Sequence, residues 1–246
     1  MKNKLDLSKE EKRKIFLKEY LLVFLISLLF YRNIFISLIT AFASLLILKV
    51  KINEEIDKKR DKLLNDFKIF LSIYSSASST GDEPFTALKY AYGEFVKLNG
   101  DDGLLATKLK ELIDKNMIYQ NFGLSLLEFA DEFDIREITN FAETTNIALK
   151  SFGNISEILT ETTSVISKRI ELDFEIKKMF YEKKFELKLL IVIPIMIFAF
   201  LSLTANEYLS PMYTSLGGYL VITITLLLIL SAYILGNRMM GVDLNE

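Results

Sequence analysis

Continuous apolar stretches alternate with amphipathic stretches along this 246-residue chain. Residues 189–205 and residues 217–235 contain no charged side chain. At a rise of about 1.5 Å per helical residue, each stretch covers most of a hydrocarbon core about 30 Å thick. Helices of this length inside soluble proteins usually keep a polar stripe, which these stretches lack. Both therefore predict membrane-spanning helices, and a membrane helix tolerates Pro194 in the first of them.

A third apolar stretch, residues 20–50, is too long for one helix perpendicular to the bilayer and has Arg32 near its middle. One strongly tilted helix would hold Arg32 near the bilayer centre at a cost of about 2.5–3.5 kcal/mol, whereas a hairpin would place Arg32 at its turn. Lysines and arginines are frequent on both sides of the stretch. Because basic flanks stay in the cytoplasm, both ends are expected there, which favours the hairpin.

The same rule orients the C-terminal pair of apolar stretches. Several lysines precede residue 189, Arg238 follows the second stretch, and residues 206–216 contain no basic side chain. The connection between the two stretches is therefore expected outside the cell. The sequence predicts a multi-pass protein of the bacterial plasma membrane, with four transmembrane helices and both termini in the cytoplasm.

The expected parts of the chain follow from this topology. They are a basic cytoplasmic N-terminus (residues 1–19), a transmembrane hairpin (20–50), a cytoplasmic helical domain (51–188), a transmembrane helix pair (189–235) and a cytoplasmic tail (236–246). The two external turns are expected to be very short.

Residues 51–188 show the apolar periodicity of amphipathic helices and no useful length of strand-like alternation. Breaks that contain glycine separate the periodic stretches, and we expect Gly81, Gly123 and Gly153 to lie in turns. The pattern predicts an all-α fold in which about six helices form an antiparallel bundle. No breaker occurs between Ile155 and Pro194, so the last helix is expected to continue into the membrane as one long rod.

Aromatic side chains recur on the apolar faces of these predicted helices. We expect them to form the core of the bundle rather than a ligand site. They are Phe67, Phe70, Phe85, Phe95, Phe129, Phe133 and Phe141.

Acidic residues dominate the middle of the predicted domain, where thirteen aspartates and glutamates stand against six lysines and arginines between residues 82 and 143. The flanking parts of the domain are slightly basic. This distribution predicts basic roots near anionic lipid and an acidic far end that could dock a partner. A solvated face that avoids lipid explains the same charges, and both interpretations stay open.

Side chains that carry chemistry are scarce in this sequence. The absence of Cys, His and Trp excludes disulfides, zinc sites built on Cys or His, and imidazole bases. No phosphate-binding glycine loop occurs. The paired acids Asp82/Glu83 and Asp131/Glu132 adjoin predicted helix ends, where they are expected to cap helices. The sequence therefore predicts no enzymatic activity, no catalytic residue, no cofactor and no metal, and its net charge of -2 favours no nucleic-acid partner.

The order of several short motifs resembles the F-domain family of type II secretion systems. Residues 57–81 resemble the family's basic opening helix, which ends in a small-residue turn at Gly81. The other matching pieces are Ala87-Leu88, Gly123-Leu124-Ser125 with Leu127, Phe129 and Ala130, Asp134-Ile135 with Phe141, the turn at residues 151–154, Ile193-Pro194, and residues 239–244. Asp82-Glu83-Pro84 and Phe152 depart from the glycine-rich turns of the family.

Within that family the chain resembles a platform subunit of tight-adherence (Tad or Flp) pilus machines, and a B-like subunit, although these motifs do not separate B-like from C-like subunits. The resemblance implies an inner-membrane protein that couples a cytoplasmic secretion ATPase to pilin assembly and has no activity of its own. The implied partners are the ATPase, a second homologous platform subunit, pilin subunits and membrane lipid, within a homo- or hetero-oligomer.

Two other functions remain open at this level. A four-helix membrane sensor or transporter accessory protein with a helical cytoplasmic domain would need ligand chemistry in its external connection, where residues 206–216 offer only Glu207 as a charged side chain. A coiled-coil signalling module would need several continuous heptads, which the glycines at positions 81, 103, 123 and 153 interrupt.

Overall fold

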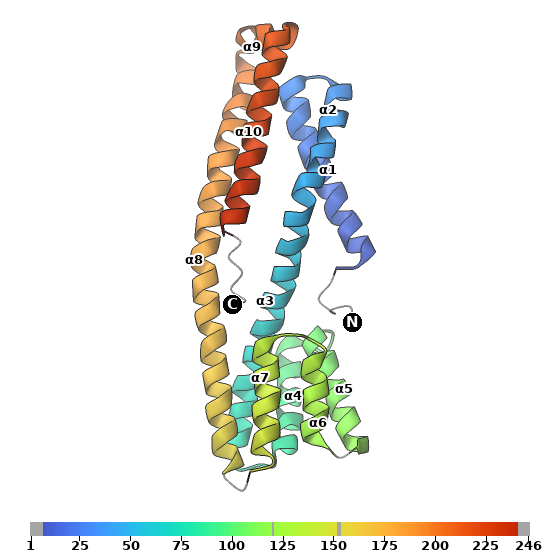
Figure 1. The fold of residues 1–246 in the computed structure, drawn as a ribbon, viewed down its shortest axis with the longest axis vertical. Coiled ribbons are helices and arrows are strands. Elements are labelled where there is room, and N and C mark those ends of the chain that lie inside the picture. The colour runs from blue at the N-terminus through green and yellow to red at the C-terminus, as the bar shows by residue number, and fades with distance from the viewer. Residues whose placement is uncertain (1–6, 120, 152–153, 241–246) are drawn as a thin grey trace. The chain divides into compact units, whose positions relative to one another are not determined.

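The computed structural model describes residues 7–119, 121–151 and 154–240, and every regular element in these ranges is helical (Figure 1). The elements in chain order are α1 (Lys9–Tyr31), α2 (Ile34–Thr40), the 3₁₀ turn η1 (Ala41–Ala43), α3 (Ser44–Ser79), α4 (Pro84–Asn99), α5 (Leu104–Tyr119), α6 (Phe122–Asp131), α7 (Arg136–Ala148), α8 (Ile155–Thr204), α9 (Asn206–Thr214) and α10 (Leu216–Met240). The all-α fold class predicted from the sequence is confirmed.

The chain forms two compact units. The first, which we call the globular unit, is built from Ile56–Glu175. The second, which we call the apolar unit, combines the described residues of Leu7–Glu55 and Ile176–Glu246. Both α3 and α8 contribute residues to each unit.

The globular unit packs α4 to α7 with the later part of α3 and the first part of α8 around one core. Six of the seven phenylalanines predicted for this core are buried, and Phe85 is half-buried against Phe122 with ring centroids 5.6 Å apart. Tyr74 also lies in the core, where its ring meets Phe141 edge to face at 5.5 Å. These aromatic side chains bury large apolar areas and so dominate the energetics of the unit.

Local sequence signals explain where several helices begin and end. Ser8 and Glu11 form a capping box that starts α1. Pro84 occupies the first turn of α4, where its missing N–H costs no helical hydrogen bond. Gly81 and Gly100 have φ values of 87° and 82°, a conformation that favours glycine, and they follow the ends of α3 and α4.

The chain reverses direction inside the N-terminal apolar stretch. Arg32 ends α1 in the left-handed conformation (φ 50°), and the Asn33 side chain accepts hydrogen bonds from the backbone N–H groups of Phe35 and Ile36 to start α2. The Tyr20 hydroxyl donates to the Leu38 carbonyl at 3.3 Å, which holds α2 against α1. Residues 20–50 therefore do not form one tilted helix.

Three helical segments are long and apolar enough to cross a membrane. They are Ile34–Ser79, Ile155–Thr204 and Leu216–Asn237. The fourth crossing predicted from the sequence is not among them, because α1 carries Lys14, Lys18 and Glu19 before its charge-free end. Length and composition thus support a membrane protein with three such helices.

The C-terminal region confirms one expectation and corrects another. As predicted, α8 is one continuous helix of 50 residues, and it runs through Pro194 without a break. The connection to α10 was expected to be a very short turn, but it contains the nine-residue helix α9, in which Pro211 is accommodated. The expected tolerance of Pro194 inside a long apolar helix is thus confirmed.

Candidate functional site

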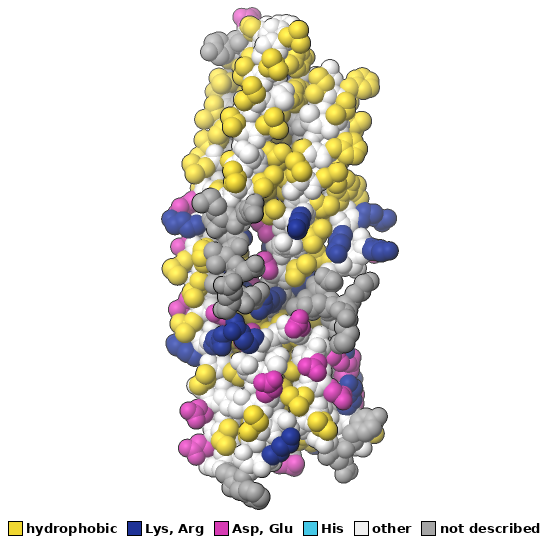
Figure 2. Space-filling model, in the orientation of Figure 1, with side chains coloured by type: hydrophobic (Ala, Val, Ile, Leu, Met, Phe, Trp, Pro, Cys, Tyr) yellow, Lys and Arg dark blue, Asp and Glu magenta, His cyan; other side chains and the backbone are white. Residues whose placement is uncertain are grey.

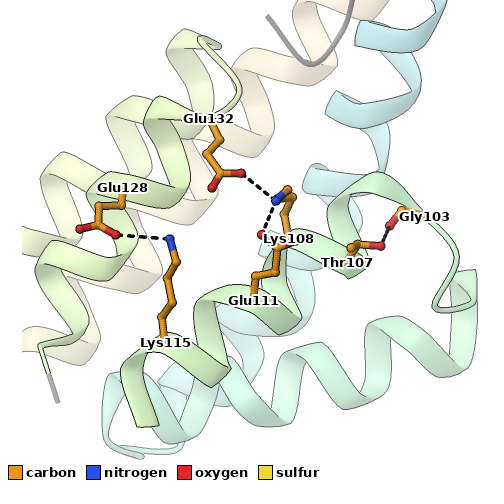
Figure 3. Close-up of polar contacts among 7 residues, drawn as sticks. All are labelled: Gly103, Thr107, Lys108, Glu111, Lys115, Glu128 and Glu132. Atoms are coloured by element: carbon orange, nitrogen blue, oxygen red, sulfur yellow. Dashed lines mark hydrogen bonds and ion pairs between the residues drawn. The ribbon is translucent and has the colours of Figure 1, made fainter. Parts of the chain in front are cut away.

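Ion pairs tie α5 to α6 in the globular unit (Figure 3). Lys108 extends from α5 toward Glu132, with its Nζ 3.0 Å from the carboxylate oxygen, and it also pairs with Glu111 one turn further along its own helix. A second pair joins Lys115 to Glu128 at 3.4 Å. The side chain of Lys108 is only 11% exposed, so its charge is neutralised within the unit rather than offered to a partner.

The paired acids do not all cap helices as the sequence predicted. Glu83 precedes α4, but its side chain makes no capping hydrogen bond. Glu132 follows α6 and pairs with Lys108. The helix cap at the start of α6 is Asn121, whose side chain accepts a hydrogen bond from the Leu124 N–H.

One carboxylate is buried against α8. Glu137 lies in the first turn of α7 with 4% of its surface exposed, and its Oε1 is 4.0 Å from Nε of Arg169 on α8. The location at a helix N-terminus also favours a negative charge there. This pair links α7 to the helix that continues out of the globular unit.

The fold distributes the acidic residues differently from the expected acidic far end. Asn99 at the end of α4 hydrogen-bonds Asp66 of α3, and Lys108 and Arg169 contact the end of α6 and the start of α7. These contacts bring the loops around residues 101–102 and 131–134 to the end at which the chain enters and leaves the globular unit. The acidic loops at 101–102 and 131–134 are therefore near the roots of the unit, whereas the exposed pair Asp82-Glu83 precedes α4 at the opposite end.

The opposite end of the globular unit exposes apolar side chains. Met117 and Ile118 at the end of α5 are 65% and 74% exposed, and Leu124 at the start of α6 is 54% exposed. The contact between Phe85 and Phe122 shows that the start of α4 lies at this end too. The apolar periodicity did not predict this exposed patch, because these residues fall outside the apolar stripes that build the core.

The three glycines expected in turns have different roles. Gly81 does lie in a turn, as described above. Gly123 instead lies inside α6, where an added Cβ would overlap Oδ1 of Asn146 and lie 3.3 Å from its Cγ, so this glycine permits close packing of α6 on α7. Gly153 lies outside the described residues. Helix breaks and close packing both select glycine, and sequence spacing alone does not separate them.

The apolar unit exposes hydrophobic side chains along its helices, as Figure 2 shows for one face. Leu190 and Leu203 on α8 are 72% and 84% exposed, and Leu216 on α10 is 87% exposed. Pro194 is also exposed on α8. Apolar surface of this extent is unusual in soluble monomers and is expected where lipid covers the protein.

Arg32 joins the N-terminal helices to the C-terminal ones inside the apolar unit. Its Nη2 donates to the Ser202 carbonyl oxygen at 2.6 Å and to the Ser202 hydroxyl at 2.8 Å, and its guanidinium lies 5.0 Å from the centre of the Tyr213 ring. Next to it, the Tyr31 hydroxyl is 2.8 Å from that of Thr223. The sequence predicted Arg32 at a turn but could not predict these partners.

A second cation of the N-terminal region contacts a tyrosine of the C-terminal region. Nζ of Lys51 on α3 lies 5.6 Å from the centre of the Tyr233 ring on α10 and 3.1 Å from the carboxylate of Glu54. Cations over aromatic faces attract the negative face of the ring. Both contacts thus connect helices that are far apart in the sequence.

Metal-binding clusters are one kind of site that the described part of the chain could hold. Among its residues, no group of three or more acidic side chains is arranged to hold a metal ion. No family model matches the chain, and neither the curated proteins nor the solved structures include a match. The candidate functional surfaces are therefore the two ends of the globular unit and the lipid-exposed helices of the apolar unit.

Proposed function

We propose that this chain is a platform subunit of a type II secretion or Flp-type (tight-adherence) pilus machine in the bacterial inner membrane, where it couples a cytoplasmic ATPase to pilin assembly. The first support is the ordered set of motifs that resembles the F-domain family. Gly81, Ala87 and Ser125 of these motifs lie at a turn, in the core and at the buried start of α6. They thus occupy positions on which the helical body depends for its turns and its packing.

The observation that carries the proposal is the continuity of α8. This helix contributes Leu159, Ile166 and Ile170 to the core of the globular unit, and its later part reaches the apolar cluster at Phe198. A continuous helix transmits a displacement that a flexible linker would dissipate. We therefore propose that α8 is the lever through which force on the globular unit reaches the membrane helices.

Four crossings with both termini in the cytoplasm form part of the proposal. Arg32 hydrogen-bonds Ser202, two residues before α8 ends at Thr204, so the turn after α1 lies at the level of the end of a membrane-length helix. The charge-free part of α1, Tyr20–Tyr31, rises only about 18 Å along its axis. The proposed crossing therefore needs Lys14 and Lys18 to extend their ammonium groups to the headgroups.

The proposal assigns no chemistry to the chain itself. Its partners would be the ATPase, a second homologous platform subunit and pilins, with lipid around the apolar helices. The ATPase is expected to bind the globular unit, one end of which exposes the apolar side chains Met117, Ile118 and Leu124. Polar rims around exposed apolar side chains are common in protein interfaces.

Deletion of the gene tests this function. Cells without the chain should lose their extracellular filaments while keeping normal pilin levels, and the intact chain supplied on a plasmid should restore the filaments. The affinity-purified chain, extracted in mild detergent, should carry a hexameric ATPase. Normal filament assembly in the deletion strain would overturn the proposal.

A further inference from the structure

The apolar unit has two cation–tyrosine contacts at opposite ends of one apolar stretch. Arg32 contacts Tyr213 and Lys51 contacts Tyr233, and both tyrosines belong to the C-terminal helices. The helical residues between the two cations rise about 27 Å, close to the thickness of a hydrocarbon core. The N-terminal helices are thus fastened to the C-terminal helices once near each boundary of the apolar zone.

The Arg32 contact is the stronger of the two. Its guanidinium makes two hydrogen bonds to Ser202, and one of them satisfies a carbonyl group in the last turn of α8. Carbonyl groups there lack helical partners and carry the negative end of the helix dipole. Immediately beside this contact, the rings of Phe30 and Phe198 stack in parallel at 4.1 Å.

A pair of hydroxyl groups on α1 and α10 also joins the helices at the Arg32 end. Tyr31 meets Thr223 of α10 at 2.8 Å, and the Tyr31 ring stacks on Tyr219 at 6.3 Å. Parting the helices here would break the Tyr31–Thr223 and the Arg32–Ser202 hydrogen bonds together.

The Lys51 contact joins the two regions through fewer groups, although Lys51 is half-buried whereas Arg32 is exposed. The ammonium group lies 5.6 Å from the Tyr233 ring and is shared with Glu54, which lies on the same helix as Lys51. If the Tyr233 contact opened, Lys51 would keep its ion pair with Glu54. The ammonium is also a strongly hydrated point charge on a flexible stem, so water can replace the ring.

We propose that the apolar unit opens like a hinge, with Arg32 as its fixed joint and the Lys51–Tyr233 contact as its latch. The N-terminal helices and α10 separate at the Lys51 end and stay joined at Arg32. The device follows from contacts within the apolar unit and does not depend on the platform function.

Spin labels measure this directly, because the natural chain contains no cysteine. One pair of labels, on Phe35→Cys and Leu216→Cys, reports on the Arg32 end, where both side chains are largely exposed. The other pair, on Lys49→Cys and Leu235→Cys, reports on the Lys51 end. Distances are recorded by pulsed electron resonance on the full chain in phosphatidylcholine vesicles.

Three results are expected from these pairs. In the otherwise unchanged chain, the distance distribution should be broader at the Lys51 end than at the Arg32 end. Lys51→Met should shift the Lys51-end distances upward by several ångströms and leave the Arg32-end distances unchanged. Arg32→Gln should broaden the Arg32-end distribution, and Arg32→Lys should broaden it less.

Lys9→Met is the matched control, since it removes an exposed lysine from the start of α1 without touching either contact. It should change neither distribution. The hinge is refuted if Lys51→Met leaves the Lys51-end distances unchanged, or if it moves both pairs equally. If the Arg32→Gln chain does not insert into the vesicles, the distances in Lys51→Met and Arg32→Lys still test the hinge.

Discussion

Glu137 and Arg169 face each other across the contact between α7 and α8, with Oε1 of the carboxylate 4.0 Å from Nε of the guanidinium. The carboxylate is buried, whereas the arginine side chain is 46% exposed. A buried charge that loses its partner is far more costly than an exposed one. The pair therefore helps to hold α8 on the globular unit, at a point six residues before that unit ends at Glu175.

Arg169→Ala is expected to destabilise the globular unit. The substitution leaves the Glu137 carboxylate without its cation, and because the arginine is partly solvated the cost should be about 1–2 kcal/mol. Thermal unfolding of the full chain in detergent should then begin a few degrees lower, and amide hydrogen exchange in α7 should accelerate.

Arg136→Ala serves as the control for that experiment. Arg136 is the neighbour of Glu137 and is exposed, so its removal should change stability by less than about 0.5 kcal/mol. Equal effects of the two alanine substitutions would show that the Arg169 contact has no special weight.

Gly123→Ala is expected to destabilise the chain, although alanine favours helices. Overlap of the new methyl group with Asn146 should cost about 1–3 kcal/mol, which outweighs the helix-propensity gain of about 1 kcal/mol. In an Asn146→Ala background the overlap disappears, and the same substitution should become stabilising. Thermal unfolding midpoints with glycine and with alanine at position 123, measured in both the natural and the Asn146→Ala chain, check this prediction.

Gly93→Ala provides the comparison. Gly93 lies inside α4, and nothing lies within 4 Å of the position that its Cβ would take. Alanine there should stabilise the chain by about 0.5–1 kcal/mol. A stabilising Gly123→Ala in the natural background would mean that Asn146 moves aside freely and that the close packing of α6 on α7 is not required.

Local signals in the sequence explain several helix boundaries in the globular unit. Pro84 and the glycines at 81 and 100 act through their own backbone preferences, so their effects can be recognised without knowing the fold. Gly123 was misassigned because its reason lies in Asn146, on another helix. The number of charges along the sequence could not predict where the acidic loops lie. Successive helices run in opposite directions, so alternate loops lie at opposite ends of the unit.

Contacts between distant parts of the sequence could not be predicted at all. Arg32 and Ser202 are separated by 170 residues, and no periodicity in either segment identifies the other. The sequence did show that Arg32 would be costly near the bilayer centre, which favoured a turn at this residue. It could not show that the partner of Arg32 is the end of α8.

Cysteine labelling tests the proposed four crossings. The reporters are Ile34→Cys beside the turn after α1, Leu216→Cys at the start of α10, and Asp101→Cys in the globular unit, all of which are exposed positions. A membrane-impermeant maleimide should label the first two in intact cells, because both turns are expected outside. Asp101→Cys should react only after the membrane is permeabilised.

The reporter at Ile34 spares Arg32, whose loss would disturb the contact with Ser202. Reaction of Leu216→Cys but not of Ile34→Cys in intact cells would mean that the N-terminal hairpin enters the bilayer without crossing it. Labelling of Asp101→Cys in intact cells would invert the orientation and exclude an ATPase partner.

Insertion of Gly-Gly-Ser after Glu182 tests α8 as a lever. The insertion interrupts the helix between its contribution to the globular core and its apolar part, and it should abolish filament assembly while the chain still enters the membrane. Insertion of seven alanines at the same place adds about two helical turns and nearly keeps the facing of the helix, so it should preserve substantially more assembly. Gly-Gly-Ser between Asp101 and Asp102, in the exposed connection before α5, should have little effect. Normal filaments with the insertion after Glu182 would show that no force passes through this helix.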